Sequence, residues 1–225
     1  MATNFNTSGR VCCDEAGGKR PHLYRYREAL LGSVACISAL AAATLPAAAA
    51  CDSPVTANGI LIIQCSGTIT SKDAPAVSYS STTDPFEILS SATISTTGAN
   101  AYGIYGYGEG PYVLINSTGS VRTTGDNAHG VVAVGRNTIA VALFDGSVVT
   151  LGAGAHGIYT TSTSQTFGNS GILSIGSVST SGDGAHGLYS TTDADGTGPT
   201  VPTGSIIRMI SEGNITTKGN DARGV

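Results

Sequence analysis

Three histidines occupy the same place in a repeated segment of this 225-residue chain. His129, His156 and His186 each stand between an alanine and a glycine, and Tyr102 and Arg223 fill the equivalent place in the flanking copies. If the copies stack, these five side chains form a ladder. Neighbouring imidazoles could hold a metal ion, or could form an acid-sensitive strip because protonated rings repel one another. No acid or cysteine recurs beside them, so we favour a ladder of polar, stacking side chains without a metal.

Three tyrosines share a second position of the repeat. Tyr105, Tyr159 and Tyr189 lie there, and Val132 fills it in the remaining complete copy. An exposed tyrosine ladder could stack on sugar rings, although such a ladder more often packs against its own neighbours. Carbohydrate binding by these tyrosines is therefore one hypothesis, and packing against neighbouring side chains is the alternative.

Recognisable catalytic groups are sparse. Asp126 and Asp183 occupy equivalent turn positions, where aspartate is well tolerated for conformational reasons. Enzymes that cleave glycosidic bonds need two acids placed together on one face. The chain also lacks a Gly-x-Ser-x-Gly elbow, a His-Glu-x-x-His pair and a phosphate-binding loop. We therefore predict a protein that is not an enzyme and that has no catalytic, cofactor-binding or metal-binding residues. A carbohydrate-active enzyme is the alternative.

The elements that position these residues follow from the repeat itself. Its pattern is Gly-x-x-Ala-x-Gly-aliphatic, and the spacings between successive copies are 27, 27, 30 and 37 residues; the copies begin at Gly98, Gly125, Gly152, Gly182 and Gly219. A period of this size predicts a solenoid. Four residues before each first glycine lies a β-branched residue in a segment of alternating character: Ile94, Val121, Val148, Val178 and Ile215. That alternation predicts a strand with one buried face.

Each repeat contains two further apolar segments, one before this strand and one after the glycine motif, as in residues 112–115 and 130–134. Three short strands with glycine corners make one coil. Glycine allows positive φ at the corners, and the alanine is small enough to lie beneath a tight bend. We therefore predict an all-β parallel β-helix over residues 91–225, with coils about 4.8 Å apart. Residues 106–111, 161–169 and 191–205 are predicted to be loops inserted between strands.

The first fifty residues do not join the repeat. Residues 1–28 are basic, and residues 29–50 are apolar, rich in alanine and end in Ala-x-Ala. This order is typical of a secretory signal peptide, so we predict an extended signal region with a signal helix at 1–50, cleaved between Ala50 and Cys51. A permanent membrane anchor and a lipid anchor on Cys51 are the alternatives. For residues 1–28, upstream sequence included by a misplaced start is the alternative.

Two cysteines remain after the predicted cleavage site, Cys51 and Cys65. In an exported chain such a pair predicts one disulfide. A loop of this size would stabilise the fold by roughly 3 kcal/mol in the chain-entropy model. The bond would pin residues 59–64 over the open first coil, where a solenoid needs a cap. Residues 51–90 are therefore predicted to form the cap and the first coil.

The net charge of the chain beyond residue 50 bears on whether it can bind nucleic acid. Beyond residue 50 there are six Lys and Arg against twelve Asp and Glu, which gives a net charge of about −6. Nucleic-acid binding needs a basic face, so we predict no nucleic-acid partner.

Together, the signal region, the segment from Cys51 to Cys65-Ser66-Gly67 and the repeats resemble the start of an autotransporter passenger, the type V secretion family. The resemblance covers about residues 29–225, and residues 1–28 do not clearly match it. It implies a right-handed parallel β-helix on, or released from, the surface of a Gram-negative bacterium, acting in adhesion. It also implies a C-terminal outer-membrane β-barrel that this chain lacks. Because the chain stops inside a repeat, we expect it to be a fragment. The partner would be an unknown host or cell-surface ligand, for which a carbohydrate is one candidate.

Overall fold

The computed structural model describes residues 50–163, 169–193 and 206–225, and these residues form nineteen strands. The predicted signal helix and residues 1–49 lie outside the described residues. Among the residues that are described, no helix is long and apolar enough to span a membrane.

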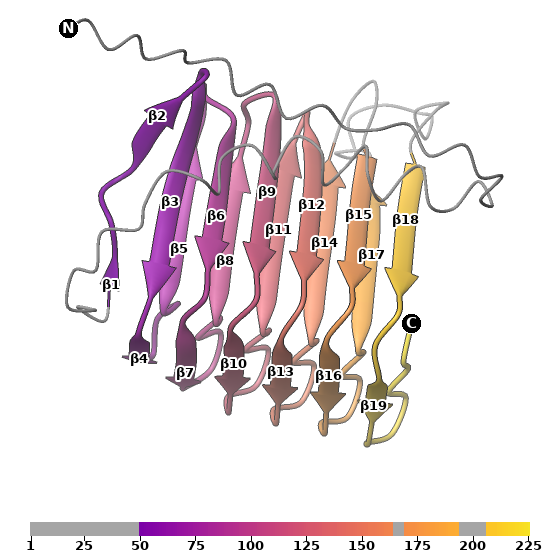
Figure 1. The fold of residues 1–225 in the computed structure, drawn as a ribbon. Coiled ribbons are helices and arrows are strands. Elements are labelled where there is room, and N and C mark those ends of the chain that lie inside the picture. The colour runs from indigo at the N-terminus through magenta and orange to yellow at the C-terminus, as the bar shows by residue number, and fades with distance from the viewer. Residues whose placement is uncertain (1–49, 164–168, 194–205) are drawn as a thin grey trace, which may run out of the picture. The chain divides into compact units, whose positions relative to one another are not determined.

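The strands stack into a parallel β-solenoid of about five turns, which confirms the predicted fold class (Figure 1). Each coil gives one strand to each of three sheets, which we call sheets A, B and C. Sheet A contains β3 (Ile60–Ser66), β6 (Phe86–Ser90), β9 (Tyr112–Ser117), β12 (Ile139–Phe144), β15 (Asn169–Ser174) and β18 (Ile206–Ser211). Sheet B contains β4 (Thr68–Lys72), β7 (Thr93–Thr97), β10 (Ser120–Thr123), β13 (Ser147–Thr150), β16 (Ser177–Thr180) and β19 (Ile215–Thr217). Sheet C contains β5 (Val77–Ser81), β8 (Ile104–Gly108), β11 (Val131–Arg136), β14 (Ile158–Thr163) and β17 (Leu188–Asp193).

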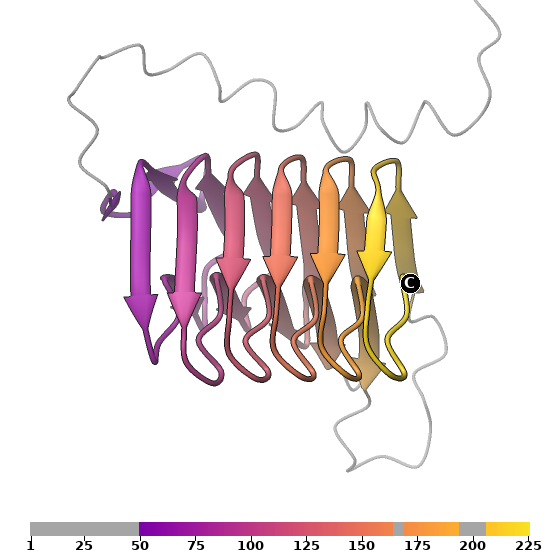
Figure 2. The same cartoon turned by 90° about the horizontal axis from the view of Figure 1, so that it is seen from below.

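The register between coils follows the repeat. In sheet B the β-branched residues of the alternating strands pair along the axis, as Val121 does with Ile94 on one side and Val148 on the other. All three side chains are at most 1% exposed. Figure 2 shows the strands of sheet B in a row, with a similar turn leaving each one. The period-two pattern therefore identified the buried face correctly.

In four strands of sheet B, β7, β10, β13 and β16, a threonine near the end of the strand fastens the following turn. Thr123 and Thr150 are fully buried, and their hydroxyls donate to the backbone carbonyls of Ala128 and Ala155, the latter at 2.7 Å. The same bond joins the threonines of β7 and β16 to their alanines. Each of these alanines is 0% exposed, as the predicted tight bend requires.

The reason why the motif begins with glycine differs from the predicted one. Positive φ falls at the third position of the motif, which holds Asn100, Asn127, Gly154, Gly184 and Asp221. The first glycine has positive φ in the two terminal copies only. In the central copies it is needed because the coils approach so closely: a Cβ on Gly152 would lie 1.9 Å from the carbonyl oxygen of Gly125. Steric contact between coils, more than backbone conformation, therefore selects the first glycine.

The core changes character along the axis. In the first coils it is aromatic, since Tyr79 packs edge-on against Phe86 with ring centroids 5.0 Å apart. Three coils further along, the hydroxyls of Thr160, Ser190 and Ser170 form a closed cycle of hydrogen bonds of 2.9, 2.8 and 2.8 Å. Each hydroxyl both donates and accepts, so these polar groups are satisfied inside the solenoid.

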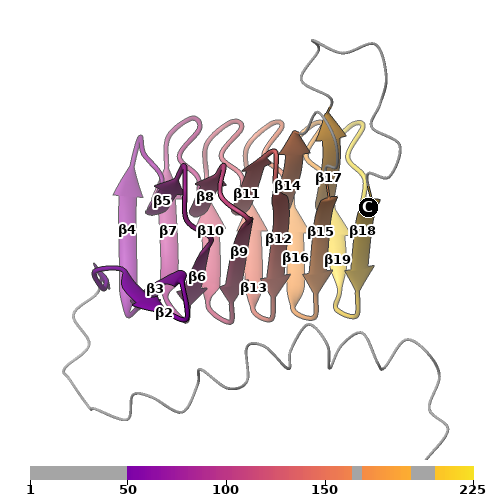
Figure 3. The same ribbon diagram turned by 90° about the horizontal axis from the view of Figure 1, so that it is seen from above.

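The first coil is covered by two short antiparallel strands, β1 (Ala50–Cys51) and β2 (Val55–Ala57), which pair with β3 (Figure 3). Cys51 and Cys65 are register partners and are joined by the predicted disulfide, with an S–S distance of 2.05 Å. The two-residue turn Asn58-Gly59, with φ of 53° and 78°, connects β2 to β3. Residues 60–64 lie within β3, so this segment is the first strand of sheet A, and β1 and β2, not β3, cover the first coil.

The predicted loops are shorter than expected. Residues 106–108, 161–163 and 191–193 belong to β8, β14 and β17, since each strand of sheet C continues the ladder of its neighbour. Asn169 belongs to β15, and the remainder of the two later loops, residues 164–168 and 194–205, lies outside the described residues. The predicted cleavage between Ala50 and Cys51 stays a prediction; in the uncleaved chain Ala50 pairs with Ser66.

Candidate functional site

The predicted ladder is present as a column of stacked rings along one corner of the solenoid. Tyr102 lies over His129 with centroids 5.4 Å apart, and the two histidine pairs that follow are 4.8 and 4.9 Å apart. Neighbouring ring planes deviate by 7° or less. Arg223 continues the column without a ring. We call Tyr102, His129, His156, His186 and Arg223 the ring column.

Each histidine of the column also bonds to the next coil. The Nδ1 atom of His129 accepts the backbone N–H of His156 at 2.9 Å, and Nδ1 of His156 accepts that of His186 at 3.0 Å. Nδ1 of His186 accepts the backbone N–H of Arg223 at 3.2 Å. An accepting Nδ1 carries no proton, so each neutral imidazole is the Nε2–H tautomer. Protonation at Nδ1 would break the bond between coils.

Burial opposes that protonation. It lowers the pKa of His129 from 6.5 to about 4. It lowers the pKa of His156 to about 3, and the neighbouring His129 and His186 reinforce the effect. Among the described residues, none of these histidines forms an ion pair with a carboxylate that would favour the imidazolium form. Burial therefore favours the neutral form of His129 and His156.

A second row of rings lies beside the column. Tyr159 stacks on Tyr189 with centroids 5.5 Å apart, and Tyr189 also meets the rings of His156 and His186 at 4.6 and 5.1 Å. Tyr105 stacks on Tyr102 at 5.5 Å. Ring faces inside these stacks are covered by other rings, although Tyr189, the last tyrosine of the row, is 37% exposed. The covered rings present only their edges to an outside molecule, whereas stacking on a sugar needs an open ring face. The arrangement therefore does not favour sugar stacking on these rings.

The two turn aspartates have a structural task. Oδ1 of Asp126 accepts the backbone N–H of Ala153 at 2.9 Å, and Oδ1 of Asp183 accepts that of Asn220 at 2.8 Å. Each carboxylate thus satisfies a donor of the following coil, as the turn interpretation predicts. Within the described ranges no group of three histidine, cysteine or acidic residues could hold a metal ion.

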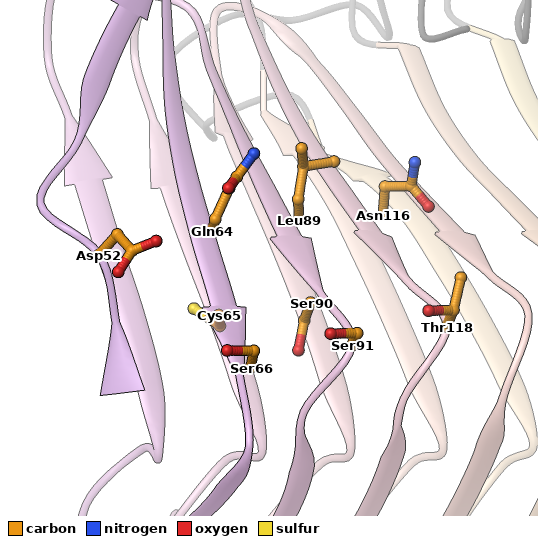
Figure 4. Close-up of a pocket in the computed structure, with 9 residues that line it drawn as sticks. All are labelled: Asp52, Gln64, Cys65, Ser66, Leu89, Ser90, Ser91, Asn116 and Thr118. Atoms are coloured by element: carbon orange, nitrogen blue, oxygen red, sulfur yellow. The ribbon is translucent and has the colours of Figure 1, made fainter. Parts of the chain in front are cut away.

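A hollow of about 260 Å³ opens near the capped end of sheet A (Figure 4). Its lining is mostly polar and comes from the cap and from the first three strands of the sheet: Asp52, Gln64, Cys65, Ser66, Leu89, Ser90, Ser91, Asn116 and Thr118. The figure shows Gln64, Leu89 and Asn116 side by side on successive strands, with Ser66, Ser91 and Thr118 in a second row. We call this place the cap hollow.

A buried acid stands next to this hollow. Glu87 is 4% exposed, pairs in register with Ile62 and Leu114, and has an Oε1 atom with no hydrogen-bond partner in the part of the chain that the structure describes. Burial raises its pKa, and a hydrogen bond with Asn116 opposes that effect. The carboxyl group is therefore poorly suited to a full charge.

Sequence reasoning found the ring column and missed the cap hollow. The hollow is made of residues from the cap and three coils, and only the strand register brings Gln64, Leu89 and Asn116 together. One readable signal was overlooked: Asn58-Gly59 between two apolar segments is typical of a hairpin turn, and it predicts that β2 folds back on β3.

Comparison of the chain with models of protein families, with curated proteins and with solved structures gave no match. Function is therefore inferred from the fold and from the geometry of the ring column and the cap hollow.

Proposed function

We propose that this chain is a non-catalytic passenger-type β-solenoid, exported from a Gram-negative cell and acting in adhesion or surface interaction. One observation carries the proposal: a regular parallel solenoid whose first edge is closed by the Cys51–Cys65 disulfide. Disulfides persist in oxidising compartments, which supports a location outside the cytoplasm. The β-solenoid is compatible with an autotransporter passenger, in agreement with the signal pattern of residues 29–50.

The use of the polar side chains supports a non-catalytic role. The histidines and turn aspartates bond backbone donors of the next coil, so their reactive atoms hold the coils together. A stack of similar coils presents a long, repetitive surface, which suits attachment to an extended partner. Adhesion is therefore the role that best fits the described residues.

The test of export uses the full chain with a C-terminal tag in a Gram-negative host. We expect processing after Ala50, a tag outside the cytoplasm, and Cys51 and Cys65 protected from thiol reagents until reduction. A variant with charges in the apolar region, Leu31→Arg and Leu40→Arg, should stay unprocessed. Cytoplasmic protein in which Cys51 and Cys65 are both free thiols would contradict the proposal.

The test of adhesion uses beads coated with the purified processed chain. We expect them to adhere to cultured epithelial cells more strongly than beads coated with heat-unfolded chain. Equal adhesion of the two preparations would remove the adhesion part of the proposal while leaving export untouched.

A carbohydrate-active enzyme remains the alternative. It would need paired acids, and Asp52 is the one acid in the lining of the cap hollow. Release of reducing ends from a polysaccharide, abolished by Asp52→Asn, would establish this alternative in place of the non-catalytic role.

A further inference from the structure

The cap hollow has the chemistry of a small polar ligand site. The amide of Gln64 offers both donors and an acceptor, whereas that of Asn116, hydrogen-bonded to Glu87, keeps one N–H and its carbonyl oxygen for a ligand. The two amides flank Leu89, which offers an apolar surface. Neighbouring strands are about 4.8 Å apart, so the two amides lie roughly 10 Å apart across the leucine. The hydroxyls of Ser66, Ser91 and Thr118 form a second row that can donate or accept.

The hollow is held in shape before any ligand arrives. The backbone N–H of Asp52 donates to the carbonyl of Gln64 at 2.8 Å, and the disulfide ties the preceding residue to the same strand. The backbone N–H of Ser91 donates to the carbonyl of Cys65 at 3.0 Å, and that of Thr118 to Ser90 at 2.9 Å. The backbone around the hollow therefore needs no further ordering on binding, and the entropic cost is limited to the side chains.

Charge limits the class of ligand. Asp52 is exposed and is the single charged side chain in the lining. A carboxylate accepts hydrogen bonds from ligand hydroxyls but repels a second carboxylate or a phosphate. The hollow is therefore matched to neutral molecules with many hydroxyls and excludes acidic ones.

We propose that the cap hollow is a binding site for a neutral saccharide of one or two sugar units. The apolar face of a sugar ring would lie on Leu89, the amides of Gln64 and Asn116 would bond hydroxyls on opposite sides of the ring, and Asp52 would close one end. The inference rests on the proposed function and deepens it, since it names the ligand class that the surface recognises. It places the site on sheet A and away from the ring column, whose ring faces are already covered.

The test titrates the purified full chain with a panel of neutral disaccharides, lactose, maltose, cellobiose and N,N′-diacetylchitobiose, followed by NMR. We expect at least one probe to bind with a Kd below about 10 mM. Gln64→Ala should weaken that binding roughly fivefold, the effect of one lost neutral hydrogen bond, without altering the fold because the side chain is exposed. Leu89→Asp should weaken it more strongly, and Thr68→Ala on sheet B is the matched control.

Three results would overturn the inference: no binding by any probe, binding that Gln64→Ala and Leu89→Asp leave unchanged, or binding that Tyr159→Ala abolishes. Glucuronic acid should bind more weakly than glucose, and Asp52→Asn should reduce that difference. Bead adhesion separates the two proposals. Adhesion without saccharide binding would refute only the proposal that the cap hollow binds a saccharide. Saccharide binding without adhesion would refute only the proposed role in adhesion.

Discussion

Replacing His156 by glutamine should make the solenoid less sensitive to acid. The folded ring has a pKa of about 3 and an unfolded histidine one near 6.5, so below pH 6.5 the unfolded chain takes up a proton that the folded chain does not. Because the folded pKa is lowered, the stability from this ring is fully present above pH 6.5. It is lost as the pH falls towards the folded value.

The size of the effect follows from the width of this interval. His129 and His156 are both mainly neutral in the folded state at pH 4.5. Each would therefore lower the free energy of unfolding by about 2.7 kcal/mol between pH 6.5 and pH 4.5, at 1.36 kcal/mol per pH unit. Water reaches part of each ring, so we expect about half of that, near 1.3 kcal/mol per histidine. His156→Gln should recover its share, because a glutamine oxygen can still accept a backbone N–H without titrating.

The assay is urea unfolding at pH 7.5 and pH 4.5, compared as the difference between the two pH values in each protein. Arg122→Gln, an exposed change on sheet B, is the control and should leave the difference as in the unmodified chain. A pH difference that His156→Gln leaves unchanged would refute the reasoning. So would NMR evidence that the His156 ring in the folded chain is protonated at pH 5.5.

Three other changes test the contacts between coils. Thr150→Val removes the hydroxyl that donates to the carbonyl of Ala155 and leaves that buried carbonyl unpaired, so urea unfolding should show a loss of about 1–3 kcal/mol. Gly152→Ala places a methyl group against the carbonyl of Gly125, and we expect a loss of soluble folded protein in expression trials. Glu87→Gln removes a buried carboxyl whose pKa is raised, so it should raise the melting temperature at pH 7.5 and have less effect near pH 4. The sign is opposite to that of the histidines, because a raised carboxyl pKa lowers stability as the pH rises.

Each of these changes has a matched control. Thr68→Val on the exposed side of sheet B should alter stability by less than about 0.5 kcal/mol. Gly59→Ala meets no atom within 4 Å, so it should cost only the roughly 1–2 kcal/mol of an alanine at positive φ. Glu109→Gln, at an exposed ion pair with Arg136, should leave the melting temperature nearly unchanged. A control that behaves like its partner would show that the proposed contact is not the cause.

The repeat made much of this structure readable in advance. A fixed spacing places equivalent residues on successive coils, so the stack of His129 on His156 and the buried row through Val121 followed from counting residues. The disulfide followed from having two cysteines after a signal pattern. These features depend on position along the chain.

What the spacing could not give was atomic detail and surface shape. Nothing in the sequence says that Nδ1 of His129 accepts a backbone N–H, since either ring nitrogen could have faced the next coil. The role of Gly152 depends on an approach between coils that only coordinates measure. The cap hollow could not be predicted, because its shape depends on the register of three strands together with the position of Asp52.

The change in core composition along the axis predicts which coils of the solenoid unfold locally most easily. The coils around Phe86 and Tyr79 pack aromatic rings together, whereas the two coils that contain Thr160 and Ser170 bury a cycle of hydroxyls beside apolar side chains such as Ile158, and apolar burial is the larger source of local stability. In a one-dimensional stack each coil depends only on its neighbours, so amide protons should exchange fastest in the hydroxyl-lined coils and slowest beside the disulfide. Folding would then begin at the capped coils, and each completed coil would serve as the template for the next.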